Sequence, residues 1–198
     1  MSAILLSMAT FAFIGAASPG PVNIIATCSG VNFGFKKTLP HVIGASVCYG
    51  IIVYLAGIGI NQLDEYFGQI AQSLKYIGAL FLFFMSYKIA TAKASTQQEQ
   101  DLMSAPTLLQ GVMSQGLNPK AWLVSMSGIS VFVTTSADPG FYLYAFSGLS
   151  FVICLIGISL WAIAGDFLRA LLTKPEHQIV FNRLMGVLLA LSVVSMFI

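Results

Sequence analysis

Long apolar stretches alternate with short polar ones along this chain. Residues 1–35 and 38–63, for example, contain no Asp, Glu, Lys or Arg. A helix that crosses the apolar core of a bilayer needs about 20 residues. Each of these stretches is therefore long enough for one crossing, and the pattern predicts helices that span a membrane.

Charged residues and one turn divide the chain into six predicted helices. The pairs Lys36-Lys37 and Asp64-Glu65, the linker 92–106, the turn at Asp138-Pro139-Gly140 and a polar connection from Asp166 to His177 separate them. One helix of about 20 residues is expected within residues 1–35 and another within 102–137, and the others are expected at about 39–60, 73–91, 141–165 and 180–198. The predicted fold class is an all-α polytopic membrane protein with six transmembrane helices in a single domain, residues 1–198.

The basic residues predict how the helices are oriented. The segments that follow the first, third and fifth helices hold or adjoin seven basic residues: Lys36, Lys37, Lys88, Lys93, Arg169, Lys174 and Arg183. The opposite side has only Lys75. Because cytoplasmic loops of membrane proteins are enriched in Lys and Arg, those three segments are predicted to be cytoplasmic and both termini periplasmic.

The overall composition excludes several classes of protein. Of the 198 residues, 57% are hydrophobic and only 8% are charged, and the mean hydropathy is +0.86. A soluble domain carries about 25% charged residues, so the composition argues against a cytosolic enzyme. Nucleic-acid binding needs clustered Lys and Arg, which are absent here. The first apolar stretch has no preceding basic residue and is interpreted as a retained membrane helix, not a signal peptide.

Two halves of the chain resemble each other. Ser18-Pro19-Gly20 in the first helix matches Asn118-Pro119-Lys120 in the fourth, Gly44 matches Gly148, and Gly78 matches Gly186. This divides the chain into repeat one (residues 1–91), the linker 92–106 and repeat two (107–198). Each repeat has three predicted crossings, an odd number, so the second must be inverted relative to the first. Many secondary transporters have this plan, with a binding site at broken helices between the repeats.

The first Pro motif, Ser18-Pro19-Gly20-Pro21-Val22-Asn23, lies inside an uncharged stretch. Two prolines remove two backbone donors and clash with the preceding turn, so the first helix is expected to break here. Gly20 between them allows a ligand to approach the backbone closely. The alternative interpretation is a kink that serves only helix packing. If the break forms a site, its candidate substrate-binding residues are Ser18, Pro19, Gly20, Pro21 and Asn23.

The second Pro motif, Asn118-Pro119-Lys120, predicts a matching break in the fourth helix. Lys120 is the only charged residue between Asp101 and Asp138. A charge at this depth is costly unless it faces a cavity or a partner, and the alternative is a lysine that reaches toward the interface. A cation beside two helix N-termini suits an anionic group such as a carboxylate. Asn118, Pro119 and Lys120 are therefore candidate substrate-binding residues.

Three residues are candidates for coupling transport to protons. Lys120 is one, because burial favours the neutral form of an amine. His41 could relay protons, although a surface histidine near the cytoplasmic end of its helix is the simpler interpretation. Asp166 is the third, although pairing with Arg169 would also account for it. Four aromatic residues could line a cavity or only pack: Tyr49, Tyr54, Tyr87 and Trp161.

The chain resembles a known family. The segments SPGPVN, QGLNPKAWL and LKYIGALFLFFMSYKIA, with six crossings in about 200 residues, resemble the lysine-exporter and homoserine/threonine-efflux (LysE/RhtB-type) superfamily. The resemblance covers essentially the whole chain. It implies an exporter of amino acids or their derivatives in the bacterial inner membrane, coupled to the proton gradient and acting by alternating access.

The resemblance also implies which residues matter and leaves the substrate open. Pro19, Gly20 and Pro21 match one family motif, and Asn118-Pro119-Lys120 match the other. Asn23 follows the first motif as in members that resemble cysteine and O-acetylserine exporters, but one residue does not decide a substrate.

Functions other than export fit the sequence less well. An intramembrane enzyme would need a paired nucleophile and deep histidine or a metal motif, and neither is present, so the chain is not expected to be an enzyme. A metal-cation exporter of the cadmium type is the alternative, since Cys28, Cys48 and Cys154 could bind soft cations, but they share no obvious face. No metal site, disulfide framework or cofactor is expected. The expected partners are a small-molecule substrate, protons and lipid, and a homodimer is possible.

Overall fold

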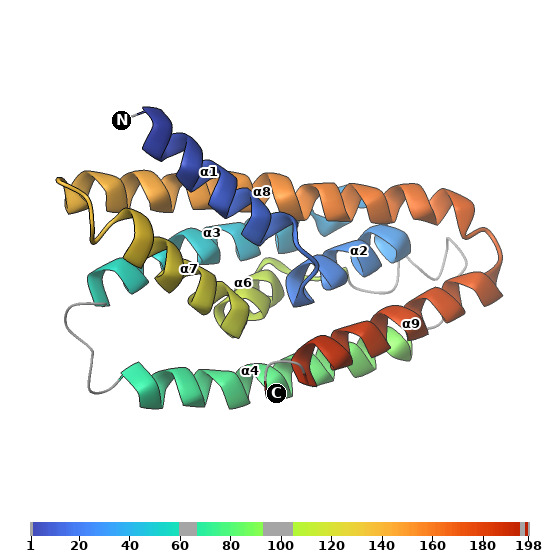
Figure 1. The fold of residues 1–198 in the computed structure, drawn as a ribbon. Coiled ribbons are helices and arrows are strands. Elements are labelled where there is room, and N and C mark those ends of the chain that lie inside the picture. The colour runs from blue at the N-terminus through green and yellow to red at the C-terminus, as the bar shows by residue number, and fades with distance from the viewer. Residues whose placement is uncertain (1, 60–66, 93–104, 195–196, 198) are drawn as a thin grey trace.

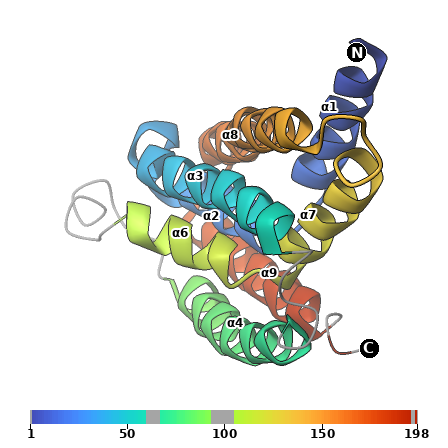
Figure 2. The ribbon, with the colours of Figure 1, turned by 90° about the vertical axis from the view of Figure 1, so that its left-hand side faces the viewer.

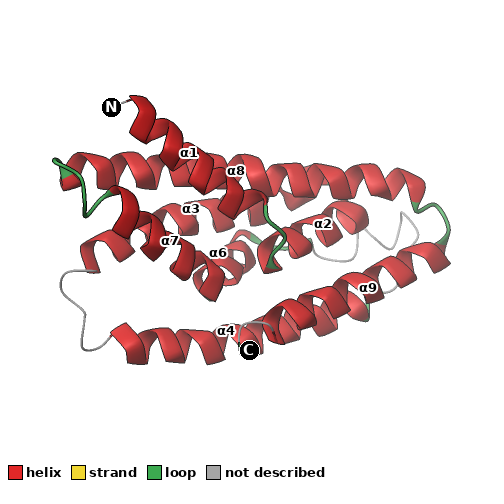
Figure 3. Cartoon of the chain, in the orientation of Figure 1, coloured by secondary structure: helices red, strands yellow, loops and turns green. Residues whose placement is uncertain are grey.

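The computed structural model describes residues 2–59, 67–92, 105–194 and 197. Over these residues all regular secondary structure is helical (Figures 1 and 3). The helices are α1 (Ser2–Ala17), α2 (Pro21–Phe33), α3 (Phe35–Gly59), α4 (Phe67–Ala90), α6 (Leu108–Gly116), α7 (Pro119–Phe132), α8 (Pro139–Leu171) and α9 (Pro175–Val194). The expectation of an all-α fold is confirmed over the described residues.

Both Pro motifs interrupt a helix, as the sequence predicts. The axes of α1 and α2 differ by 59°, and Gly20 at the start of α2 has an extended backbone. Asn118 before α7 is also extended, and Pro21 and Pro119 each occupy the first position of the helix that follows. Proline is favoured at this position because its missing N–H would have no partner within the helix.

Three helices, α3, α8 and α9, are individually long and apolar enough to cross a membrane, and α1 with α2 qualifies as one bent span. Helix α4 contributes a shorter apolar segment, Tyr76–Ala90. These elements agree with a multi-pass membrane protein. The number of six crossings and the inverted relation of the halves stay predictions.

Several predicted helix boundaries are wrong. Helix α3 begins at Phe35, so Lys36 and Lys37 lie within it and do not separate two helices, and α4 begins at Phe67 and not near residue 73. Helix α8 continues to Leu171, so Asp166 and Arg169 lie within a helix and not in the predicted polar connection. Helix α9 begins at Pro175 and not near residue 180, so Arg183 lies inside it. The prediction ended each helix where charge appeared. A helix that extends past the apolar layer can carry charged residues without cost to its backbone hydrogen bonds.

The helices form three layers, which both views show (Figures 1 and 2). The long helices α3 and α8 lie along one side, and α4 with α9 forms a pair on the other. Between these layers lie α2, α6 and α7, which flank the two breaks. The breaks therefore lie between the two outer layers, where Gly20 and Asn118 are buried and Pro19 is exposed.

Small residues let the middle layer approach the long helices closely. A methyl group at Gly165 would overlap the Thr27 carbonyl, so α8 and α2 touch at their backbones. A methyl group at Gly44 would likewise overlap the Leu108 carbonyl, where α3 meets α6. Gly148, which the repeat alignment pairs with Gly44, faces open space. The two halves therefore differ in packing at this pair.

Candidate functional site

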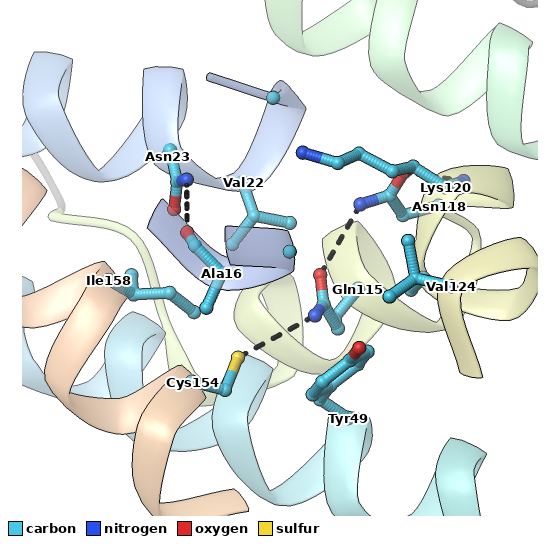
Figure 4. A pocket seen from close by; sticks show the side chains of 13 residues that line it. Ala16, Val22, Asn23, Tyr49, Gln115, Asn118, Lys120, Val124, Cys154 and Ile158 are labelled. Atoms are coloured by element: carbon cyan, nitrogen blue, oxygen red, sulfur yellow. Dashed lines mark hydrogen bonds between the residues drawn. The ribbon is translucent and has the colours of Figure 1, made fainter. Parts of the chain in front are cut away.

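A cavity of about 40 Å³ lies between the two helix breaks (Figure 4). Its walls come from the end of α1, the first turns of α2 and α7, the last turn of α6, and the middle of α3 and α8. The lining residues are Gly15, Ala16, Gly20, Val22, Asn23, Tyr49, Gln115, Asn118, Lys120, Ala121, Val124, Cys154 and Ile158. Both predicted motifs thus contribute to one site, although they are about a hundred residues apart.

Lys120 reaches across the cavity to the first break. Its Nζ donates to Ser18 Oγ at 2.7 Å, to the Ser18 carbonyl at 3.3 Å and to the Pro19 carbonyl at 3.4 Å. Asn118 fixes the start of the helix that carries the lysine, because its Oδ1 accepts from the Lys120 backbone N–H at 3.2 Å. A methyl group at Gly20 would lie 3.3 Å from the Lys120 Nζ. The glycine therefore leaves the space that the ammonium group occupies.

The carbonyl groups released by the first break all have side-chain donors. Asn23 Nδ2 donates to the Ala16 carbonyl at 2.8 Å and to the Ser18 carbonyl at 2.9 Å. Trp161 Nε1, from α8, donates to the Ala17 carbonyl at 3.2 Å. Unpartnered carbonyls are costly in an apolar medium, so these donors stabilise the break. The predicted substrate residue Asn23 does line the cavity, but its amide N–H groups are committed to the backbone.

The start of α2 brings further positive potential to the site. No side-chain cap is present at Gly20, and the Pro21 ring has no N–H to offer. Val22 and Asn23 follow in the first turn and line the cavity. The N-terminus of a helix carries a partial positive charge, and Lys120 adds a full one nearby. Among the described lining residues there is no carboxylate, so the site as a whole attracts anions.

The opposite part of the cavity is polar but uncharged. Gln115 in the last turn of α6 accepts from Asn118 Nδ2 at 3.4 Å and donates through Nε2 to Cys154 Sγ at 3.7 Å. Tyr49 from α3 lines the same region, as one of the two sequence interpretations proposed. Gln115 was missed by the sequence reasoning, although it belongs to the same QGLNPK segment as Lys120. The sequence reasoning treated Cys154 as a buried hydrophobic residue or as a possible ligand for soft cations, and not as part of a substrate site.

His41 and Asp166 lie outside the lining of the cavity. His41 is 0% exposed, so the interpretation as a surface histidine is wrong. Its two ring nitrogens have no hydrogen-bond partner, and the ring lies near the Val22 backbone, at the first turn of α2. Asp166 instead lies with Arg169 beside Gly34, at the junction of α2 and α3.

The remaining aromatic candidates have structural roles. Trp161 supports the first break, as described above. Tyr54 packs against Tyr144, with ring centroids 5.7 Å apart. Tyr87 is 69% exposed on α4, which suits a residue at the lipid-facing surface.

Comparison with known proteins identifies the family. The profile of the LysE type translocator family matches residues 13–197. The chain belongs to this family. The resemblance that the Pro motifs suggested is thereby confirmed, and a family of translocators agrees with a membrane protein that is not an enzyme.

Two curated relatives of this LysE-family chain cover nearly its full length. A cysteine/O-acetylserine efflux protein of Shigella flexneri serotype 5b (strain 8401) is 29% identical over 200 residues, with 100% of both chains covered. A protein of the same name from Escherichia coli (strain K12) is 28% identical over 196 residues, covering 98% of this chain and 97% of its own. No solved structure matches the chain.

Proposed function

We propose that this LysE-family protein exports a small zwitterionic amino acid, or a derivative of one, across the bacterial inner membrane. The observation that carries the proposal is the position of Lys120, whose ammonium group and the uncapped start of α2 share one cavity. The names of the relatives, which are efflux proteins for cysteine and O-acetylserine, support the same class of substrate.

Both charged groups of a zwitterion have partners in this cavity. The carboxylate would bind Lys120 and the free N–H groups in the first turn of α2. When Lys120 turns toward the carboxylate, it releases the oxygen atoms of Ser18 and Pro19 that it contacts now. These oxygens can then accept from the ammonium group of the substrate. One exchange of partners thus accounts for binding of both charges.

The size of the cavity supports a mechanism in which the site opens and closes. Pockets that hold small molecules have volumes of about 300–1,000 Å³, whereas this one has about 40 Å³. The helices that enclose it must therefore separate to admit an amino acid. In the proposed inverted repeats, α1 is equivalent to α6, and α3 is equivalent to α8. The contact between α1 and α8 should therefore have a counterpart between α6 and α3, and both contacts are present. Alternating access would rock one repeat against the other at the two breaks.

We further propose that export is coupled to the proton gradient through Lys120 and His41. Lys120 touches the cavity directly. A protonated His41 would be a buried cation with no counter-charge beside it among the described residues, so its protonation favours a state in which α2 moves away and water enters. Of the helices packed against α3, α2 carries the titratable group Cys28, α6 carries none, α7 carries Lys120, and α8 carries Asp166 among others. Asp166 is remote from the cavity lining and is not assigned this role.

Transport into inverted membrane vesicles tests the proposal, because inversion turns export into measurable uptake. Vesicles with an acidic lumen should accumulate labelled O-acetylserine, cysteine or threonine only when they contain the protein. Lys120→Gln should lower the uptake about 10- to 150-fold, since a hydrogen bond to a charged group contributes about 1.5–3 kcal/mol.

The matched control for that substitution is Lys88→Gln, which removes an exposed lysine at the end of α4 and should leave uptake unchanged. Normal uptake by the Lys120→Gln protein would refute the role of Lys120. Accumulation of cadmium in place of any amino acid would refute the substrate class.

A further inference from the structure

The uncharged end of the cavity has unused hydrogen-bonding capacity at Gln115. This side chain is 6% exposed, and its two contacts are long: 3.4 Å from Asn118 Nδ2 to Oε1, and 3.7 Å from Nε2 to Cys154 Sγ. A glutamine side chain has two donors and can accept twice, and a thiol is a weak acceptor. A polar group on a ligand can therefore improve on the partners that Gln115 has now.

Gln115 lies between the end of the cavity that holds Lys120 and the uncharged end that Tyr49 and Cys154 line. In Figure 4, Lys120 and Asn118 lie on one side of Gln115, and Cys154 and Tyr49 lie on the other. A substrate whose carboxylate and amine engage Lys120 and the first break would direct its side chain toward the amide of Gln115. The residue is thus placed to contact the part of the substrate that differs among amino acids.

The charges around the cavity limit which side chains fit there. The described lining residues include one cation, Lys120, and no carboxylate. The ammonium group of a lysine substrate would be buried here without a counter-charge, which is costly. Hydroxyl, thiol and ester groups can instead exchange hydrogen bonds with an amide at no charge penalty.

We propose that Gln115, supported by Cys154, determines specificity by contacting the substrate side chain and selecting short, uncharged polar ones. This inference rests on the proposed export of amino acids and adds a residue that distinguishes among them. Gln115 acts through its amide group. Changing the chemistry of that group at constant size should therefore change the choice of substrate more than the overall rate.

The first test is Gln115→Glu, which supplies the missing carboxylate in nearly the same shape. Uptake of L-lysine and of O-acetyl-L-serine is compared in inverted vesicles. The ratio of lysine to O-acetylserine uptake should rise at least about tenfold, because the ammonium group gains a charged partner. The matched control is Gln110→Glu on the same helix. Gln110 closes the capping box with Thr107, and glutamate serves equally well there, so the ratio should not change.

A second variant covers the case in which a buried glutamate prevents folding. Gln115→Met keeps the length of the side chain and removes its hydrogen bonds. The wild-type protein should prefer threonine to valine, which has the same shape without the hydroxyl, and Gln115→Met should reduce this preference about five- to tenfold.

The outcomes separate this inference from the proposed function. If the wild-type protein accumulates no amino acid, the proposed function fails. If the wild-type protein transports and an active Gln115 variant keeps the wild-type ratios, the role of Gln115 is refuted while export stands. Shifted ratios in Gln115→Glu or Gln115→Met, with unchanged ratios in Gln110→Glu, support the inference.

Discussion

Replacing Asn23 tests whether side chains hold the first helix break together. Asn23→Leu keeps the approximate shape of the residue and removes both donors. The Ser18 carbonyl would still accept from Lys120 at 3.3 Å, but the Ala16 carbonyl would lose its Asn23 donor at 2.8 Å. Ala16 is partly buried, and a carbonyl left without a partner there costs about 1–3 kcal/mol. The free energy of unfolding should fall by that amount.

The measurement is reversible unfolding in mixed detergent micelles, followed by tryptophan fluorescence. Since 1.4 kcal/mol is tenfold in an equilibrium constant, the predicted loss is about 5- to 150-fold in the folded-to-unfolded ratio. A second variant, Trp161→Phe, removes the donor to the Ala17 carbonyl from a different helix.

The two substitutions act on neighbouring carbonyls of one break. The double variant measures their coupling, as the difference between its loss of unfolding free energy and the sum of the losses in the single variants. An Asn23→Leu protein that is as stable as the wild type, within about 0.5 kcal/mol, would contradict this account. Asn23 would then be free to bind substrate, as the sequence interpretation first had it.

Two further predictions concern packing and coupling. Gly165→Val should prevent folding or lower the free energy of unfolding by at least about 3 kcal/mol, because its side chain would overlap the backbone of α2. Gly148→Ala should leave the free energy of unfolding unchanged, because that glycine faces open space. Size-exclusion profiles and unfolding in detergent distinguish the two variants. His41→Gln should keep substrate exchange between the two sides of the vesicle but lose the stimulation by an acidic lumen. Equal stimulation in the variant and the wild type would exclude His41 from coupling.

Local features of the sequence were sufficient to predict both helix breaks. Proline removes a backbone donor wherever it occurs, so the effects of Pro21 and Pro119 do not depend on the rest of the fold. Lys120 was also identifiable from the sequence alone, because the number of residues that separate it from the nearest charges can be counted along the chain. These local features also carry the family resemblance, which the match over residues 13–197 confirms.

The tertiary structure decided which side chains meet at the site. Gln115 and Cys154 are 39 residues apart, and only the packing of α6 and α8 around the cavity brings them together. His41 is buried because α2 and α6 pack against it. The residues next to it in the sequence could not indicate this burial. Asn23 bonds to the backbone of α1 because α2 turns away by 59° at the break.

The physical reason for this division is the range of the interactions. Helix breaks and helix-forming stretches depend on backbone hydrogen bonds within a few residues, so the sequence determines them directly. The choice of partner for a side chain depends on the angles and distances between helices, which close packing of the whole chain sets. The sequence by itself therefore determined where this protein bends and which cation lies far along the chain from any other charge. Only the tertiary structure decided what that cation and the bend enclose.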